Sequence, residues 1–438
     1  MAQNTFQTTS KVEKAIAFQW KAFDGFLDHL EYHNDELPGA VDKTGYSKLI
    51  PRPSRHTANL IDGLSGSKAG ANDGQYFEDL SLTPPPTGYG EMVDVSFPFR
   101  LRYKVVTDLQ VSLEDLMFKM DREQAMDQHF TPAIIEHKNK MESAIAALIE
   151  ASAGNTVTTD GSYDGYVEAL YKSRQLMVNR AGISANTEKF ALLNTSVLPK
   201  IGLAGAKVMQ AQGANDIYGK GEFRPIAGFN LYESPTLATP TYNAIGATAV
   251  VAAGYAVTAR NTAPWTPTWS LDVTGLTNDV VIKAGTKIKF TNGSTDIRWI
   301  VPTVGADAGF AATFTVVSTV QASATGTATL VLSEPFISGG DFKNVDAALV
   351  AGTTKVVIAV TAGSILTPSY AFDKSAVWVG SPKVKYPKGV DNAINLKLGG
   401  VNISLIEDHW TGTLQSTSKI ISFLAVGISK PEAITCIY

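Results

Sequence analysis

Apolar and polar residues alternate along the chain with two different periods, and the longest helical pattern covers residues 112–152. Its beginning has the form of a helix start, because Ser112 is followed by acidic residues in the first turn. A second start follows at Thr131 and Pro132, since proline lacks the N–H that a first helical turn leaves unpaired. Apolar residues then recur at helical spacing, at Ile134, Ile135, Met141, Ile145, Leu148 and Ile149.

This pattern predicts a long helix that is bent or broken at Pro132. If the helix is continuous, it spans about 60 Å at 1.5 Å per residue. Its polar residues fall mostly off the apolar stripe, namely Lys138, Asn139, Lys140, Glu142 and Glu150. By itself the pattern favours an ordinary buried helical hairpin over the spine of an elongated, slab-like molecule, and the rest of the chain decides between them.

A period-two pattern covers residues 91–107, where apolar residues from Val93 to Val105 alternate with polar ones. Pro98 cannot donate to a sheet ladder, so we expect an edge strand. The preceding residues 51–90 carry five prolines and a glycine-rich, polar centre. Such a stretch has little core of its own and is typical of a functional or disordered excursion. Together the two stretches predict a long, two-stranded protruding loop.

Residues 11–33 carry large apolar side chains near helical spacing and predict an amphipathic N-terminal helix. Its aromatic face has to dock on something, either in its own subunit or in a neighbouring one. Further along, the pattern predicts a helix over 164–180, a strand over 189–193, a helix running to about residue 212, and a strand within 222–239. On the second helix, Val167, Leu170, Tyr171, Arg174 and Val178 share one face.

The composition changes over residues 241–365, which contain only 14 Asp, Glu, Lys and Arg. Turns such as Asn292-Gly293 separate short strand-like runs. The runs cover residues 269–273, 286–290, 298–301, 313–320, 328–332 and 354–360. We expect an all-β module, a sandwich or a barrel, that is inserted into an α/β body. That body resumes with strands over 370–379, 401–406 and 419–428, the last buried on both faces, and a turn at Pro431-Glu432.

Composition limits the possible functions. A chain of 438 residues suggests two or three domains, and we expect neither a membrane span nor a signal peptide. The single cysteine, Cys436, excludes an internal disulfide. The formal charge of −4 argues against tight phosphate-driven binding to nucleic acid. Two small basic clusters, near Arg102 and Lys385, are more typical of solvated strand or loop faces.

No constellation of catalytic residues stands out in the sequence. Residues 63–74 are glycine-rich but lack the Gly-Lys-Ser/Thr ending of a phosphate loop, and no Gly-x-Ser-x-Gly elbow occurs. His29 and His33 have the spacing of half a metal site, but no third ligand is indicated. Glu407, Asp408 and His409 are interpreted as a strand-end turn. Nothing pairs Asp391 or Glu432 for catalysis, so we predict no catalytic, cofactor-binding or metal-binding residues and a chain that is not an enzyme.

Three stretches in this order resemble the major capsid (coat) proteins of tailed bacteriophages, in particular those of short-tailed Salmonella phages. Residues 224–235 (RPIAGFNLYESP) resemble the strand before the family's insertion, and 427–434 (GISKPEAI) resemble its closing segment. Residues 285–290 (GTKIKF) and 314–317 (FTVV) resemble its inserted six-stranded barrel. Each stretch is short, so the specificity lies in the ordered set, and the first 90 residues match only by type of element.

The resemblance implies an α+β capsid fold with an N-terminal arm (1–50), an extended loop and β-ribbon (51–107), and a spine helix with the first part of an α/β body (108–240). An inserted β-barrel domain (241–365) and the remainder of the body (366–438) complete it. The implied function is an icosahedral shell of hexamers and pentamers in the virion, assembled in the host cytoplasm around phage double-stranded DNA.

The implied partners are a scaffolding protein, a portal and a decoration protein, with non-specific proximity to packaged DNA and no membrane. Two alternatives stay open. One is the shell of a cellular nanocompartment with the same fold. The other is a β-rich surface adhesin, suggested by the tryptophans Trp265, Trp269 and Trp299 of the Thr/Ala-rich module.

Overall fold

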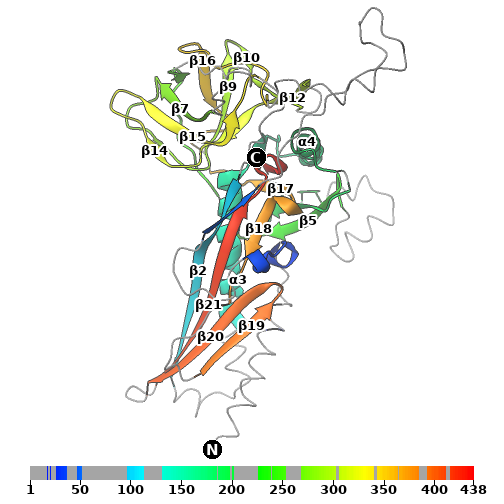
Figure 1. Ribbon diagram of the computed structural model, residues 1–438, viewed down its shortest axis with the longest axis vertical. Coiled ribbons are helices and arrows are strands. Elements are labelled where there is room, and N and C mark those ends of the chain that lie inside the picture. Colours follow the sequence, from blue (N-terminus) through cyan, green and yellow to red (C-terminus); the bar gives the residue numbers. More distant parts are fainter. Residues whose placement is uncertain are drawn as a thin grey trace, which may run out of the picture.

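The molecule is elongated, with a long sheet at one end, a smaller sheet in the middle and a β-rich upper unit at the other end (Figure 1). The structure is a computed structural model. It describes residues 17, 20, 26–36, 47–51, 96–112, 131–184, 186–197, 200–201, 225–237, 239–252, 268–301, 305–339, 343–363, 365–383, 392–410 and 415–438. This part of the chain is rich in strands, and two α-helices are described along their whole length.

The long sheet is antiparallel and contains the longest strands of the molecule. Its order is β1 (Ser47–Pro51), β2 (Ser96–Ser112), β21 (Gln415–Ile428), β20 (Val401–Trp410) and β19 (Asn392–Leu398), and β18 (Val377–Gly380) also pairs with β21. Pro98 pairs with Leu49 of β1, and the ladder between β2 and β21 begins only at Arg100. Within the described chain Pro98 therefore has a strand on one side only, in agreement with the edge position expected for it.

The alternation of β2 is interrupted by a β-bulge between Leu101 and Tyr103. Before the bulge, Phe97 and Phe99 pack in one small cluster with Ile50, Ala425 and Trp378. After it, Tyr103 and Val105 pack against the larger cluster that contains Leu424. The period-two pattern placed Phe97, Phe99, Tyr103 and Val105 on one face of the strand. This prediction is wrong, because the extra residue of the bulge turns the side chains that follow it to the other face.

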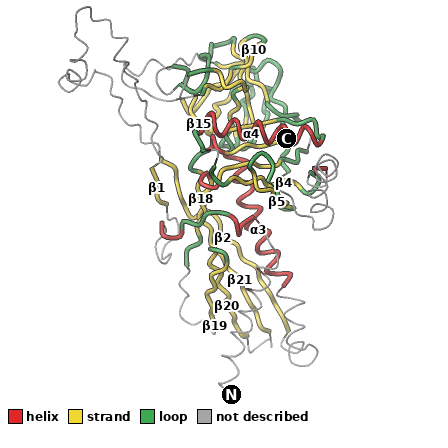
Figure 2. Tube along the Cα trace, turned by 90° about the vertical axis from the view of Figure 1, so that its right-hand side faces the viewer, coloured by secondary structure: helices red, strands yellow, loops and turns green. Residues whose placement is uncertain are grey.

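The helix α3 (Thr131–Ser152) lies alongside β2 and β21 (Figure 2). Pro132 occupies its first turn, and Ile134, Met141, Ile145, Leu148 and Ile149 are buried as predicted, whereas Ile135 is half-buried. The expected start at Ser112 is wrong, since Ser112 is the last residue of β2 and pairs with Gln415. Residues 113–130 lie outside the described part, and with them any continuation of the helix across Pro132.

The predicted polar face of α3 is also wrong for three residues, because Lys138, Glu142 and Glu150 are almost completely buried. Ile134, Lys138, Met141 and Ile145 are spaced by four, three and four residues, which places Lys138 in the same row as its apolar neighbours. The spacing therefore indicated a buried position for Lys138, although lysine is usually exposed. Buried charged side chains need hydrogen-bond or ion-pair partners, which the elements packed around α3 have to provide.

The central sheet has the order β3 (Asn155–Val157), β22 (Ile434–Ile437), β17 (Ser369–Asp373), β4 (Lys189–Asn194) and β5 (Phe229–Ser234). Its two outer pairs are parallel and its inner pairs antiparallel. The predicted strand 370–379 is two strands in two different sheets. A single 3-10 turn, η6 (Lys374–Ala376), separates β17 from β18, and Asp373 caps the turn through the backbone N–H of Ser375.

The helix α4 (Tyr163–Ala181) is capped at its start by Ser162 and at its end by Gly182 in the left-handed conformation. It buries Tyr166, Ala169, Leu170, Ser173, Leu176, Met177 and Arg180. The predicted face was partly wrong, because Tyr171 and Val178 are exposed. The strand predicted over 419–428 is confirmed as part of β21, and the closing turn is η7 (Pro431–Ala433).

The upper unit is formed by β10 (Thr295–Asp296), β9 (Lys287–Asn292), β16 (Thr354–Ile358), β6 (Val250–Val251), β7 (Thr268–Thr274) and β15 (Ala328–Phe336), in that order. Strand β13 (Thr313–Thr315) pairs with β9, and a bridge between Val316 and Leu332 connects this end of the sheet to β15. Asn292-Gly293 is the predicted hairpin turn, with Gly293 at φ 64°.

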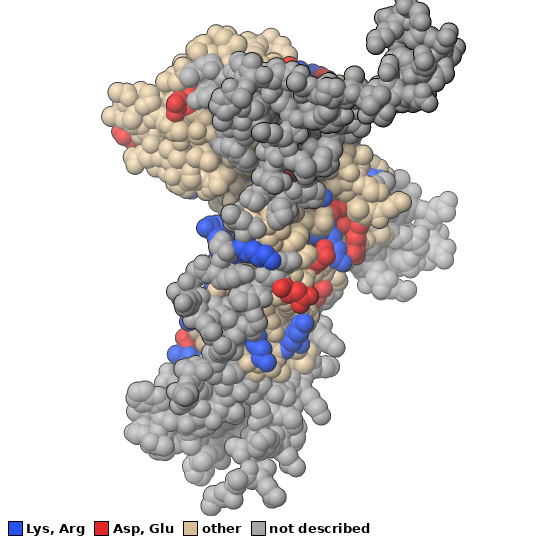
Figure 3. Space-filling model, in the orientation of Figure 1, with Lys and Arg blue, Asp and Glu red and all other residues tan. Residues whose placement is uncertain are grey.

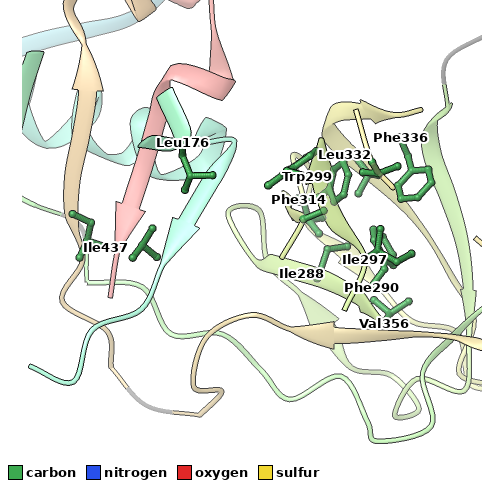
Figure 4. Close-up of a cluster of buried hydrophobic side chains, with 14 of the residues drawn as sticks. Leu176, Ile288, Phe290, Ile297, Trp299, Phe314, Leu332, Phe336, Val356 and Ile437 are labelled. Atoms are coloured by element: carbon green, nitrogen blue, oxygen red, sulfur yellow. The ribbon is translucent and has the colours of Figure 1, made fainter. Parts of the chain in front are cut away.

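Two further ladders complete the upper unit. Strand β11 (Arg298–Ile300) pairs with β12 (Asp307–Ala311), and β14 (Val320–Gln321) pairs with β8 (Val281–Ile282). The strands enclose an aromatic core of Phe290, Trp299, Phe314 and Phe336 (Figure 4). Phe336 meets Phe290 edge-on at 5.7 Å, a favoured arrangement of aromatic rings. The run predicted as one strand over 313–320 is split between β13 and β14.

The N-terminal helix was predicted to run to His33. Within the described residues the end of this segment forms two short 3-10 turns instead, η1 (Phe26–His29) and η2 (Asn34–Glu36), and Tyr32 makes a parallel bridge to Val379 of β18. This extended stretch arises because the backbone of residues 31–33 bonds to β18 rather than to itself. Of the other described residues of the segment, Ala17 and Trp20 are helical.

None of the helices in the described ranges is long and apolar enough to cross a membrane.

Candidate functional site

The two histidines considered as half a metal site have separate aromatic partners. The His29 ring stacks on Tyr232 with 4.2 Å between centroids, and the His33 ring stacks on Trp378 at 3.7 Å. Both contacts join the N-terminal segment to the body. Throughout the part of the chain that the structure describes, no group of three or more His, Cys, Asp or Glu side chains could hold a metal ion.

The other polar residues considered from the sequence are distributed over different elements. The interpretation of Glu407, Asp408 and His409 as a turn is wrong, because their backbones lie inside β20 and pair with residues 416–418 of β21. Glu432 lies in η7, where its backbone carbonyl accepts a hydrogen bond of 2.7 Å from Asn155 Nδ2. Asp391 lies outside the described residues.

The first polar cluster surrounds Glu150 near the end of α3 and was not expected from the sequence. The Tyr242 hydroxyl donates to Glu150 Oε1 at 2.5 Å, and the Tyr438 hydroxyl donates to the same oxygen. The Cys436 thiol donates to Oε2 at 3.3 Å. One carboxylate therefore connects α3, the last strand and the segment that leads into the upper unit.

The donors around Glu150 keep their protons. Burial, reinforced by the charge of Glu150, raises the pKa of the Tyr242 and Cys436 side chains far above their usual range. The pKa of Tyr438 is raised as well, first by burial and then by the neighbouring Cys436 and Glu150. The three groups thus act as hydrogen-bond donors at neutral pH, and Cys436 is a buried thiol rather than a reactive one.

A second set of contacts satisfies the carbonyl groups at the end of α3. Lys287 Nζ of β9 donates to the Glu150 carbonyl oxygen at 2.5 Å and to Thr315 Oγ1 at 3.1 Å. The Thr315 hydroxyl donates to the carbonyl oxygen of Ala153. Since the last carbonyls of a helix lack partners within the helix, side chains from the upper unit cap α3. The positive charge of Lys287 also suits the negative end of the helix dipole.

Arg180 of α4 makes a third connection to the upper unit. Its guanidinium donates to Glu334 Oε2 at 2.5 Å and to the carbonyl oxygen of Gly154 at 3.0 Å. It also lies 3.4 Å from the centroid of the Trp299 ring. A planar guanidinium suits both tasks, because it combines directional donors with a face that stacks on aromatic rings.

The second polar cluster holds the N-terminal segment on the body. Lys138 Nζ donates to Asp28 Oδ2 at 2.6 Å and lies 4.9 Å from the centroid of the Trp20 ring. The Trp20 indole N–H donates to the other Asp28 oxygen at 3.0 Å. Glu142 Oε1 accepts a hydrogen bond of 3.5 Å from the Leu27 backbone. The buried charged residues Lys138 and Glu142 of α3 therefore form the binding site for this segment.

The same segment also contacts the turn between β19 and β20. Gly399 and Gly400 both have positive φ, 56° and 98°, as a two-residue hairpin turn of this kind requires. A Cβ atom on Gly400 would lie 2.4 Å from the Tyr32 ring. Asn34 reaches both sides of this contact, because its Nδ2 donates to the Gly400 carbonyl and its Oδ1 accepts from the Ser381 N–H.

His137 joins α3 to the long sheet. One ring nitrogen lies 2.9 Å from Thr107 Oγ1 of β2, and the other lies 2.9 Å from Ser422 Oγ of β21. Burial lowers the pKa of His137 from 6.5 to about 4, so the ring is neutral at pH 7. A neutral imidazole can donate at one nitrogen and accept at the other, and hydroxyl groups can meet either requirement.

No protein-family model matches the chain, and no curated protein matches it. Several solved structures are similar to it. A structure from Mycobacterium phage Che8 is 8% identical with a TM-score of 0.41, covering 90% of this chain and 83% of that chain. The capsid structure of the Cyanophage P-SCSP1u is 10% identical with a TM-score of 0.39, covering 91% and 84%. A virus-like particle from Pyrococcus furiosus is 9% identical with a TM-score of 0.41, covering 98% of both chains.

Proposed function

We propose that this chain is a major capsid protein, which assembles into an icosahedral shell around phage double-stranded DNA. The observation that carries the proposal is the pairing of α3 with strands β2 and β21, which forms a long, narrow plate with a second unit at one end (Figures 1 and 2). This plate supports the spine helix that the sequence resemblance implies. Its elongated form suits a tile in a wall better than an enzyme with a central pocket.

Two strands of the long sheet have an edge with no partner strand among the described residues, which supports an assembly function. Within the described ranges, residues 101–112 of β2 pair only with β21, and β19 pairs only with β20. Unpaired strand edges offer backbone groups to a neighbouring chain. The exposed side chains next to one edge are mostly charged, which discourages indiscriminate pairing; they include Arg102, Lys104 and Asp108.

Shell assembly needs heterologous contacts that close into rings. Each contact has to be weak, on the order of 4 kcal/mol or millimolar affinity, so that errors dissociate. Several such contacts per subunit then give a stable shell through multivalency. The near-neutral formal charge of −4 suits a container that must not bind tightly to the DNA inside it.

The neck of the upper unit supports the proposed inserted β-barrel domain at 241–365. Thr241 and Ile365 form a bridge, and flanking bonds join Gly363 N to the Tyr242 carbonyl at 2.8 Å and Leu366 N to the Pro240 carbonyl at 3.0 Å. The chain therefore enters and leaves the unit side by side, as an insertion requires. The remaining divisions are proposed as an arm (1–50), an extended loop (51–107) and a body formed by 108–240 and 366–438.

The proposed partners are further copies of the chain in hexamers and pentamers, a scaffolding protein, a portal and a decoration protein. The proposed location is the virion, with assembly in the host cytoplasm and no enzymatic activity. The upper unit is a candidate for contacts between subunits, because the side of it in view carries few charged side chains (Figure 3). Depletion of charge is characteristic of the cores of protein interfaces.

Negative-stain electron microscopy of the expressed protein, alone and with a co-expressed scaffolding protein, tests the proposal. We expect closed shells or tubes. A protein that stays monomeric at high concentration under both conditions contradicts the proposal. Shells that form in the cell around protein cargo, with no nucleic acid inside, support the nanocompartment alternative instead.

A further inference from the structure

Most helices end in solvent or in a cap formed by neighbouring residues. The end of α3 is instead surrounded by contacts from distant parts of the chain. Three carbonyl groups near the end of α3, those of Glu150, Ala153 and Gly154, accept hydrogen bonds from Lys287, Thr315 and Arg180. Lys287 and Thr315 belong to the upper unit. Lys287 and Thr315 lie 137 and 162 positions beyond the residues that they contact, so the helix end and the upper unit form one structure.

The Glu150 side chain extends this connection to the neck. Its carboxylate accepts from Tyr242, one residue after the bridge at Thr241, and from Tyr438 and Cys436 near β22. The carboxylate has no donor of its own when ionised, so three donors match it well. In a glutamine, the amide oxygen can still accept from the two tyrosine hydroxyls, but the NH2 group then faces the Cys436 thiol, so the hydrogen bond that this thiol donates is lost.

The neck alone does not fix the orientation of the upper unit. It consists of two antiparallel segments joined by one bridge and a few backbone hydrogen bonds. Such a short two-stranded connection can twist and bend. The side-chain contacts at Glu150 and Lys287 are directional and buried, and breaking a buried polar contact leaves a costly unpaired group. They therefore select one orientation out of those that the neck permits.

Arg180 adds a second set of contacts between the body and the upper unit. They connect α4 to Glu334 of β15 and to the Trp299 ring of β11. The space between is filled, since a Cβ atom on Gly154 would lie 1.9 Å from Glu334 Oε1. The upper unit is thus connected to the body through both helices, through α3 by Lys287 and Thr315 and through α4 by Arg180.

We propose that Glu150 and Lys287 form a lock that holds the upper unit on the end of α3 in a single orientation. The unit then moves together with the helix as one rigid body. The direction of α3 in a shell subunit then fixes where the upper unit meets neighbouring subunits, a consequence that rests on the proposed function. The lock itself is a property of the monomer and can be tested without assembly.

The test uses a distance measured between the body and the upper unit. Cysteines for spin labels are introduced at Gln175 of α4 and Lys355 of β16, which are both exposed. Cys436 is buried and stays unlabelled in the folded protein. Pulsed electron paramagnetic resonance then gives the distribution of distances between the labels. We expect one narrow distribution for the parent protein.

The lock is then removed one residue at a time. We expect K287M and E150Q each to broaden the distribution at least twofold, while near-ultraviolet circular dichroism shows that both parts remain folded. The matched control is K289M, because Lys289 lies two residues away on β9 and pairs with Asp296 at the surface of the unit, not with α3. K289M is expected to leave the distribution unchanged.

A third variant keeps the test conclusive if K287M or E150Q does not fold. T315V removes only the hydroxyl that accepts from Lys287 and donates to Ala153, and it is expected to broaden the distribution in the same direction. Folded variants of Glu150, Lys287 and Thr315 that all keep the narrow distribution of the parent overturn the proposal. Broadening in K289M as large as in K287M overturns it as well, since the effect is then not specific to the lock.

Discussion

Lys138 Nζ lies 2.6 Å from Asp28 Oδ2 and connects the N-terminal segment to the middle of the long helix α3. The lysine side chain is 1% exposed and the aspartate 23%. An ammonium group at this depth depends on its partners, because moving an unpaired charge out of water costs several kcal/mol. The ion pair therefore fastens the described part of the N-terminal segment around Asp28 to the folded subunit.

Replacing Asp28 with alanine should therefore destabilise the protein by about 3 kcal/mol, because Lys138 loses its carboxylate partner. The double variant D28A/K138M should recover part of this loss, since it also removes the buried charge. Urea denaturation measures both. K140A is the control, because Lys140 and Glu136 form an exposed pair at 3.4 Å that contributes less than about 0.5 kcal/mol. A loss in D28A no larger than in K140A contradicts this account.

Acid should weaken the contact of α3 with the long sheet through His137. The folded protein holds the pKa of His137 at about 4, below the unfolded value of 6.5, so the unfolded chain takes up the proton first as the pH falls. Stability is complete above pH 6.5 and decreases down to pH 4, by about 3 kcal/mol in total and about 2 kcal/mol by pH 5.

The variant H137N separates this contribution from those of other groups. We expect H137N to be less stable than the parent at pH 7.5, and we expect the difference in unfolding free energy to shrink by about 2 kcal/mol at pH 5. Urea titrations at the two pH values provide the measurement. A difference that is the same at both pH values shows that His137 is not responsible for the acid sensitivity.

The turn at Gly399-Gly400 should tolerate no side chain at its second position. G400A adds a Cβ atom 2.4 Å from the Tyr32 ring at a φ of 98°. We expect a loss of about 2–4 kcal/mol, from backbone strain and from overpacking together. G293A is the matched control, because Gly293 also has positive φ but nothing within 4 Å of the added atom. It should cost only about 1 kcal/mol; equal losses in thermal or urea unfolding would falsify the close contact.

Deleting residues 53–90 should leave a folded subunit that does not assemble. Pro51 of β1 lies directly opposite Ser96 of β2, so the two ends of the segment are close and a short Gly-Ser turn can replace it. Circular dichroism should show an unchanged fold, and electron microscopy should show no shells. Normal shells from the deletion variant contradict the role proposed for the loop.

The sequence by itself determined most elements that are long and regular. The pattern of β21 and the helical stripe from Ile134 to Ile149 are visible because a buried face repeats at the period of its own backbone. The change in composition at residue 241 marked the upper unit, since a β module with few charges differs from its surroundings over more than 100 residues. These features depend on neighbours in the sequence, and a pattern can record them.

The tertiary structure alone decided what the buried polar residues do. Lys138 and Glu150 have the composition of a solvated helix face, yet each is buried against partners more than 90 residues away. The bulge that turns β2 over, and the break between β17 and β18, are likewise set by the strands beside them. A charge can be buried only where a distant part of the chain brings a partner, so its local pattern does not show its partner or its role.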